Sequence, residues 1–148
     1  MPEYRNQIVV VVGLILPRRD QFYAVRRKEN PVGGIAMPGG FVMEGENWRD
    51  ALAREIWEET NIRVATDEDR MRDLVNHSTP DGTKLLLFAK IEAEGILDVQ
   101  PFQTNKEVSE LLKLSVDLYQ LPQLCYPLHT KALRKYRDET FTTEDSRV

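Results

Sequence analysis

The amino-acid sequence predicts one layered α+β domain, in which β-strands surround a central helix and a second helix follows near the C-terminus. Residues 8–16 form a continuous apolar run rich in β-branched side chains, which is typical of a buried strand. Residues 48–60 contain no internal glycine or proline, so we expect a helix there. Residues 128–138 place their apolar side chains on one side of a helix, which predicts an amphipathic terminal helix. At 148 residues, the chain can bury a single substantial core.

The remaining predicted elements are strands, and turn-forming residues separate them. Residues 17–20 form a turn after the first strand, and residues 78–82 form the turn of a predicted hairpin. Residues 107–114 are expected to be extended, although their leucines would also suit a helix. The other predicted strands cover residues 21–27, 35–37, 62–65, 70–77 and 83–92.

The central helix has a predicted start, a packing side and a predicted end. Asn47 is a reasonable N-cap, because its side-chain oxygen can accept a backbone N–H of the first turn. Trp48, Leu52 and Ile56 recur at i, i+4 and i+8, which predicts a packing stripe along the helix. Asn61 tolerates the left-handed conformation better than most residues, so it is compatible with a turn directly after the helix.

Composition and charge argue against several classes of protein. The net charge of -4 is unlike that of a general nucleic-acid-binding protein. The apolar run at residues 8–16 is much too short to span a membrane, and no signal-peptide pattern surrounds it. The single cysteine, Cys125, excludes an internal disulfide, fits a reducing cytoplasm and is interpreted as a buried small apolar residue. We therefore expect a cytoplasmic protein with one domain over residues 1–139 and a flexible polar tail over residues 140–148.

Three glutamates on the central helix indicate a metal site. At about 100° per residue, Glu55, Glu58 and Glu59 fall within one arc of the helix. Their carboxylates repel one another unless a cation lies among them, and such oxygen ligands suit Mg²⁺ or Mn²⁺ rather than Zn²⁺. Magnesium combines a few carboxylates with phosphate oxygens of a substrate, which points to a bound pyrophosphate. The alternative interpretation is a solvated acidic face on which Arg54 and Glu58 pair at i, i+4.

The glycines ahead of the helix favour the metal site over a solvated face. Residues 37–40 read Met-Pro-Gly-Gly. Two glycines let backbone atoms approach a metal ion or a phosphate closely, and a helix that is merely solvated does not require them.

The stretch from Gly40 to Ile62 resembles the Nudix box and reads GFVMEGENWRDALAREIWEETNI. The box has the pattern G-x5-E-x7-R-E-U-x-E-E-x-G-U, where U is aliphatic, and each position matches except Asn61, which stands in place of glycine. The resemblance implies the family's fold, an α/β/α sandwich with a mixed β-sheet between helices. It also implies a hydrolase that acts on phosphoric anhydride bonds and uses Mg²⁺ or Mn²⁺ as its cofactor.

The resemblance implies a role for each matching residue of the box. Arg54 matches the arginine that orients the glutamates through ion pairs. Glu46 matches a glutamate that supports the loop and the helix, in some members through that arginine. The implied metal ligands are the backbone carbonyl of Gly40 and the carboxylates of Glu55, Glu58 and Glu59.

The general base varies in this family between a glutamate of the box and a glutamate on a later loop. Glu107 resembles the later glutamate, and Glu110 is close enough in sequence to compete with it. The residues expected to take part in catalysis are Arg54, Glu55, Glu58 and Glu107.

Arg27 is the expected contact with the substrate. It ends a predicted strand just before the loop that leads to the box, where a guanidinium can meet a phosphate or a ribose. The expected substrate-binding residues are Arg27, Gly39, Gly40 and Glu46.

The expected substrate is a small nucleotide, a nucleoside diphosphate linked to a group X. Phe41-Val42 and residues 30–34 resemble Nudix members that cleave ADP-ribose and related dinucleotides. Nucleoside triphosphates and capped RNA remain alternatives within the family. A nucleotide sensor that does not hydrolyse its ligand is a further alternative, although such members usually lose box glutamates that this chain keeps. Many Nudix proteins that resemble this one are dimers, which leaves a homodimer open.

Overall fold

The computed structural model describes residues 7–141, in which four strands precede the first helix and five more strands precede the last. The strands are β1 (Ile8–Ile15), β2 (Gln21–Arg27), β3 (Ile35–Ala36), β4 (Gly39–Phe41), β5 (Ile62–Val64), β6 (Arg72–Ser78), β7 (Lys84–Ile91), β8 (Ile96–Val99) and β9 (Val108–Ser115). The helices are α1 (Trp48–Thr60) and α2 (Pro127–Thr140), and the short 3-10 helix η1 (Ala93–Gly95) precedes β8.

Strand β1 lies inside a mixed four-stranded sheet. It pairs in parallel with β7 along its whole length, from Ile8 opposite Lys84 to Ile15 opposite Ile91. The antiparallel neighbours β4 and β6 complete the sheet in the order β4-β1-β7-β6. A strand in this position is covered on both faces, which explains its nearly continuous apolar sequence, IVVVVGLI.

Two smaller antiparallel sheets extend the strand layer. One has the order β3-β2-β9, and the other pairs β5 with β8. The register between β2 and β9 shifts between Arg26 and Arg27, so that Arg27 lies opposite Val108. An irregularity of this kind bends the strand and changes the direction of its side chains. Arg27 therefore lies where the regular alternation of the strand is interrupted.

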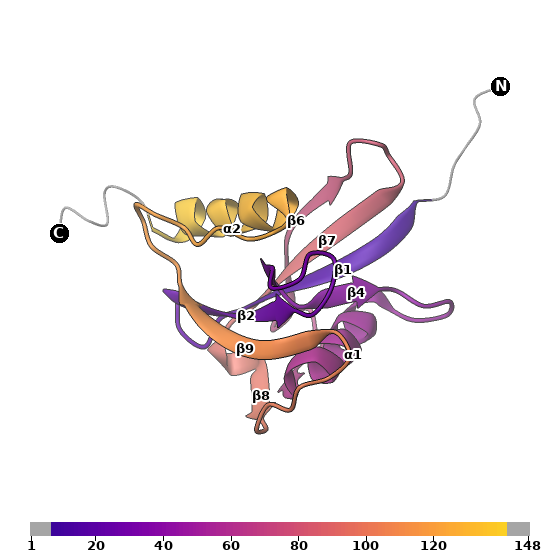
Figure 1. The fold of residues 1–148 in the computed structure, drawn as a ribbon, viewed down its shortest axis with the longest axis horizontal. Helices are drawn as coiled ribbons and strands as arrows, with labels where there is room; N and C mark the ends of the chain where they lie inside the picture. The colour runs from indigo at the N-terminus through magenta and orange to yellow at the C-terminus, as the bar shows by residue number, and fades with distance from the viewer. Residues whose placement is uncertain (1–6, 142–148) are drawn as a thin grey trace.

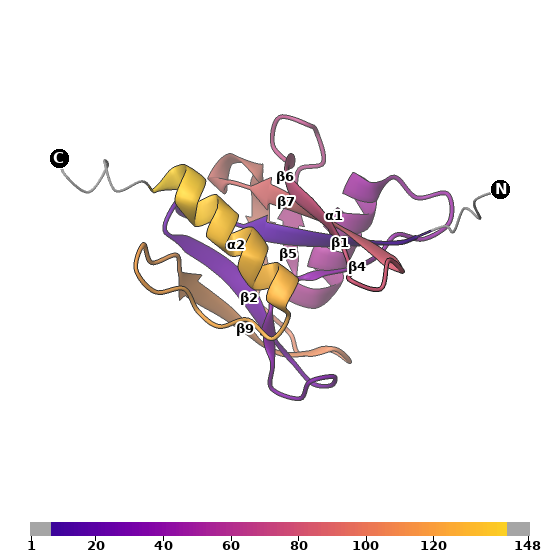
Figure 2. The same ribbon diagram turned by 90° about the horizontal axis from the view of Figure 1, so that it is seen from above.

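The two faces of β1 pack against different helices. Leu14 belongs to a core cluster with Leu133 of α2, whereas Ile15 belongs to a second cluster with Ile56 of α1. Successive residues of a strand point to opposite faces, so one apolar strand supplies both cores. Figure 1 shows α2 on one side of the strands and α1 on the other, and Figure 2 shows the strands between them from above. The predicted α/β/α sandwich with a mixed sheet is confirmed.

The local predictions for the central helix are confirmed as well. The Asn47 side chain caps the helix by accepting the N–H of Arg49 at 2.9 Å. Asn61 ends the helix in the left-handed conformation, with φ of 61°. Leu52 and Ile56 are fully buried, and Trp48 packs against the same cluster.

The sequence does not predict two of the strands, β4 and β8. Gly39 and Gly40 have little intrinsic tendency to form a strand. Strand β4 forms because it pairs with β1, and glycine is needed there because a Cβ atom at Gly39 would overlap with the carbonyl oxygen of Val11. Strand β8 lacks a buried face that would produce an alternating pattern, because Leu97 and Val99 are both exposed.

The C-terminal region differs from the predictions in its details. Cys125 is half-buried rather than buried, and partial burial raises the pKa of its thiol. Helix α2 begins at Pro127 and continues to Thr140. Residues 142–148 of the expected tail lie outside the described residues, so its flexibility stays a prediction. Within residues 7–141, neither helix has the length and hydropathy needed to cross a membrane.

Replacing Gly39 by alanine is expected to destabilise the protein by about 2 kcal/mol or more, because the new methyl group would meet backbone that cannot move aside. Gly13→Ala on β1 is the matched control, since its methyl group would lie 3.0 Å from the end of the Ile56 side chain, which can rotate. Urea unfolding followed by circular dichroism measures both free energies of unfolding. Equal destabilisation by the two substitutions would contradict the close approach of β4 to β1.

Candidate functional site

Helix α1 presents its glutamates near an end that already carries negative potential. The last turn of the helix contains no basic residue. Its free carbonyl groups concentrate partial negative charge there. Glu58 and Glu59 lie in this turn, so their side chains add negative charge where the helix already carries it.

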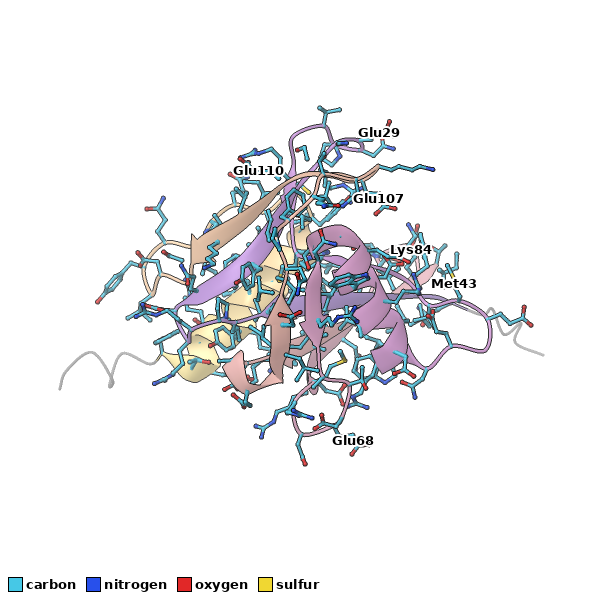
Figure 3. All side chains as sticks on the ribbon, turned by 90° about the horizontal axis from the view of Figure 1, so that it is seen from below. Glu29, Met43, Glu68, Lys84, Glu107 and Glu110 are labelled. Atoms are coloured by element: carbon cyan, nitrogen blue, oxygen red, sulfur yellow. The ribbon has the colours of Figure 1, made fainter. Side chains whose placement is uncertain are left out.

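Three carboxylates converge beside this end of α1. One carboxylate oxygen from each of Glu55, Glu59 and Glu107 lies within 4.8 Å of the other two. Glu55 and Glu59 are one helical turn apart, and Glu107 comes from the loop before β9. Figure 3 labels Glu107 in that loop and Glu110 farther along, on β9 itself. The structure thus brings two predicted metal ligands together with the predicted loop glutamate, and we call these three residues the carboxylate cluster.

Burial makes two members of the carboxylate cluster, Glu55 and Glu59, unfavourable to ionise in the absence of a cation. Glu59 is only 3% exposed, and its pKa is raised to about 8 by burial and then by the charges of Glu55 and Glu107. The N–H of Gly39 donates to Glu59 Oε2 at 3.0 Å, which offsets part of this rise in pKa. Burial also raises the pKa of Glu55, and Arg54 opposes that rise. The chemistry of these three carboxylates fits a divalent cation, because oxygen ligands without a histidine or cysteine are typical of hard cations.

Gly40 is the point at which the backbone of β4 meets the carboxylate cluster. A Cβ atom at this position would lie 2.6 Å from Glu55 Oε1, which is closer than atoms can approach. Only glycine therefore leaves room for the Glu55 carboxylate against the backbone. Each of the two glycines thus serves a different glutamate of the cluster. Gly39 donates its N–H to Glu59, and Gly40 leaves the space that the Glu55 carboxylate occupies.

Arg54 connects three glutamates with the backbone of β4. Its guanidinium forms a two-bonded pair with Glu46, at 2.8 Å and 3.0 Å. Its Nη1 donates to Glu55 Oε1 at 2.9 Å and to Glu58 Oε2 at 3.3 Å, and its Nη2 donates to the carbonyl of Phe41 at 3.1 Å. The hydrogen bond from Arg54 lowers the pKa of Glu46 to about 2. Arg54 therefore fixes the orientation of Glu55, and Glu46 acts on the cluster through Arg54.

Glu58 and Glu110 lie outside the carboxylate cluster. The Glu58 side chain is 55% exposed and shares the Nη1 atom of Arg54 with Glu55, so it lies on the open rim of the site. Glu110 accepts a hydrogen bond from Nε of Arg26 at 2.9 Å. Of the two loop glutamates considered as the base, Glu107 is the one that reaches the cluster.

Arg27 lies close to the carboxylate cluster and beside an aromatic ring. Burial is the main reason for the raised pKa of Glu59, and the positive charge of Arg27 opposes it. The Arg27 guanidinium carbon is 5.5 Å from the centre of the Tyr126 ring, and its Nε donates to the carbonyl of Glu29 at 3.1 Å. The sequence-based interpretation did not include Tyr126. The available signal was an aromatic residue directly before the proline that begins the terminal helix.

His129 is a structural residue rather than a ligand. It is 6% exposed, and its Nδ1 accepts the N–H of Met37 at 3.2 Å. Burial and the charge of Arg27 lower its pKa to about 4, so the ring is neutral near pH 7. Its ring centre lies 4.9 Å from that of Tyr126, which supports this tyrosine from the side of α2.

The fold and the site together define an α/β/α domain with a candidate carboxylate metal centre at the end of its central helix. The sequence profile of the NUDIX domain matches residues 6–137, and the chain belongs to the Nudix hydrolase family.

Related proteins agree with this membership. An RNA pyrophosphohydrolase from Cereibacter sphaeroides is 44% identical over 52 residues, which cover 34% of this chain and 32% of that protein. An ADP-ribose pyrophosphatase from Methanocaldococcus jannaschii is 42% identical over 60 residues, which cover 40% of this chain and 35% of that protein. The matched segments thus span about a third of the length of these relatives. A NUDIX hydrolase from Nitrosomonas europaea has the same fold, with a TM-score of 0.73 and 23% identity over 93% of this chain and 73% of that one.

The thermal stability of the metal-free protein is expected to fall as the pH rises from about 5 to about 8. In this range the folded protein keeps a proton on Glu59, whose pKa is about 8, whereas the unfolded chain has released it with a pKa near 4.5. Glu59→Gln removes this titration, so the decline should become smaller by on the order of a few kcal/mol. Melting temperatures measured with a chelator across this pH range test the expectation.

Added Mg²⁺ provides the control for this pH experiment. It should raise the melting temperature of the wild-type protein more strongly at high pH, because the cation binds the ionised carboxylate. A decline of equal size in the wild-type protein and in Glu59→Gln would show that Glu59 does not titrate as described.

Proposed function

We propose that this protein is a metal-dependent pyrophosphohydrolase that cleaves a nucleoside diphosphate linked to a group X. The favoured substrates are ADP-ribose and related dinucleotides, with a nucleoside monophosphate and phosphorylated X as the products. The convergence of Glu55, Glu59 and Glu107 carries the proposal, because their oxygens lie within 4.8 Å of one another at the negative end of a helix. A hard cation held by carboxylates commonly completes its coordination with phosphate oxygens of a substrate.

The proposed cofactor is Mg²⁺ or Mn²⁺. When bound, the metal ion would neutralise charge on the pyrophosphate and lower the pKa of water. Glu107 is close enough to the other carboxylates to bind the same ion. The proposed ligands in the box are the carbonyl of Gly40 and the carboxylates of Glu55, Glu58 and Glu59.

Glu107 is proposed as the general base. It is exposed, whereas Glu59 is buried and Glu55 is half-buried, so water reaches Glu107 most easily. Its carboxylate removes a proton from water while the water oxygen bonds to one phosphorus and the bridging P–O bond breaks. The electron pair of that bond leaves with the departing phosphate, and the guanidinium of Arg27 would bind that phosphate. Arg54 keeps Glu55 in position throughout.

Two likenesses support ADP-ribose and dinucleotides as the substrate class. Residues 30–34 and Phe41-Val42 resemble the corresponding segments of Nudix members that cleave these compounds, and one relative is named an ADP-ribose pyrophosphatase. Arg27 and Tyr126 would offer a cation and an aromatic ring to a nucleotide next to the carboxylate cluster.

A second candidate is hydrolysis of the terminal phosphates or the cap of RNA. A relative named an RNA pyrophosphohydrolase supports it. The net charge of -4 opposes it, because a negatively charged protein gains little general attraction for a polynucleotide. Nucleoside triphosphates are the corresponding small-molecule alternative.

Glu107→Gln is expected to lower kcat for ADP-ribose by about a hundredfold or more, because an amide cannot accept the proton from water. Glu110→Gln is the matched control and should retain nearly wild-type turnover, since Glu110 binds Arg26 instead. Glu58→Gln is expected to lose turnover by orders of magnitude while its fold survives, as a proposed ligand should. Chromatographic measurement of the released nucleotide, with Mg²⁺ present, provides the rates.

The same assay decides between the candidate functions when several substrates are compared side by side. ADP-ribose, diadenosine and flavin dinucleotides, nucleoside triphosphates and capped RNA form the panel. Faster hydrolysis of triphosphates or of RNA would overturn the proposed substrate class. Nucleotide binding without hydrolysis of any compound would instead indicate a sensor.

Arg27→Ala is expected to raise KM for ADP-ribose by about tenfold or more, because a hydrogen bond from a charged group to the substrate is lost. Arg26→Ala is the control at the neighbouring position, where the guanidinium binds Glu110 rather than facing the cluster. Steady-state kinetics of both variants measure the difference. Equal effects on KM would remove Arg27 from the proposed substrate contacts.

A further inference from the structure

The loop that carries Glu107 is fastened to the end of α1 by the side chains of two asparagines. This loop connects β8 to β9 and brings Glu107 from outside the box into the carboxylate cluster. Neither asparagine belongs to the cluster, and the function proposed above gives them no role. Their hydrogen bonds define how Glu107 is held.

Asn105 connects the end of helix α1 with the backbone of the Glu107 loop. Its Nδ2 donates to the carbonyls of Glu58 and Glu59, at 3.2 Å and 3.3 Å. Its Oδ1 accepts the N–H groups of Glu107 and Val108, both at 3.0 Å. The last carbonyls of a helix have no partner within the helix, so Asn105 satisfies two of them. A single side chain thereby joins the backbone of Glu58 and Glu59, in the last turn of α1, to the backbone of Glu107.

Asn61 fastens the same loop at an earlier point. Its backbone is in the left-handed conformation that ends α1, and its carbonyl accepts the N–H of Gln100 at 3.0 Å. Its side-chain Oδ1 accepts the N–H of Gln103 at 3.0 Å. A glycine could form the same turn but has no side-chain oxygen, so the departure from the box pattern at this position adds a contact to the Glu107 loop.

We propose that Asn105, assisted by Asn61, is a positioning residue that holds Glu107 against Glu55 and Glu59 and so preorganises the metal centre. The inference rests on the proposed metal-dependent function. Three carboxylates repel one another, and Glu107 is the member on a loop, so it would move outward first. Its backbone is held on the side of β2 by the bond from the N–H of Lys28 to its carbonyl, at 2.9 Å, and on the side of α1 by Asn105.

Direct binding of Mn²⁺ tests this role without relying on catalysis. Asn105→Ala is expected to raise the Kd for Mn²⁺ about tenfold, because the Glu107 carboxylate would no longer be held beside Glu55 and Glu59, where its negative charge attracts the cation. Asn105→Asp should weaken binding similarly, because it keeps the oxygen for Glu107 but loses the amide donors to the helix carbonyls. Asn61→Gly keeps the turn and should have a smaller effect in the same direction. Titration calorimetry and the electron paramagnetic resonance signal of free Mn²⁺ report the affinities.

Gln103→Ala is the matched control in the same loop. The Gln103 side chain is exposed, and the loop contact at this residue uses its backbone N–H, which alanine retains. This variant should bind Mn²⁺ like the wild-type protein. Melting temperatures of all variants establish that each remains folded at the assay temperature. Wild-type affinity in Asn105→Ala or in Asn105→Asp would overturn the inference.

A double-mutant cycle with Glu107→Gln distinguishes positioning from a general effect on the helix. If Asn105 acts through the Glu107 carboxylate, Asn105→Ala adds no further loss of Mn²⁺ affinity once that carboxylate is gone. Additive losses would show that Asn105 acts independently of Glu107 and would overturn the inference.

Failure of the proposed function has a different signature, in which the wild-type protein neither binds Mn²⁺ nor hydrolyses any substrate of the panel. A wild-type protein that does both, together with an unaffected Asn105→Ala variant, refutes the positioning role alone.

Discussion

Repulsion among three carboxylates at the negative end of a helix is the constraint on which the rest of the site depends. The surrounding contacts each hold one carboxylate against that repulsion. Arg54 donates a hydrogen bond to Glu55, and the N–H of Gly39 donates one to Glu59. The contact of Gly39 requires the close packing of β4 against β1. The contact of Arg54 requires its two hydrogen bonds with Glu46. In the function proposed here, a divalent cation supplies the charge that these contacts leave uncompensated.

The part of the site that depends on local spacing could be predicted from the sequence. Helical periodicity places Glu55, Glu58 and Glu59 on one arc, and the structure has them on the last two turns of α1. Periodicity cannot tell which member of an arc faces a loop that arrives from elsewhere in the chain. In the structure, Glu58 lies on the exposed rim of the site, and Glu107 from the loop lies with Glu55 and Glu59 instead. That arrangement depends on Asn105, whose partners are backbone groups without any signature in the sequence.

The same distinction between local and distant effects holds for the fold. Strands with apolar runs, such as β1 and β7, follow from patterns within a short window, and so do both helices. Strand β4 follows from its partner, because two glycines form a strand only where a neighbouring backbone is close enough to exclude side chains. Strand β8 buries little and therefore lacks a recognisable pattern. The register shift after Arg26 likewise arises from pairing with β9.

The bond between the N–H of Lys28 and the carbonyl of Glu107 has a consequence for how this protein can be redesigned. It joins the loop after β2 to the Glu107 loop through peptide groups alone. An engineer can therefore graft a new loop between β2 and β3, or natural variation can alter its side chains, without removing the link. Proline at position 28 is the exception, since it has no N–H to donate. The side chains of the loop between β2 and β3 can therefore change while the hydrogen bond to Glu107 is kept.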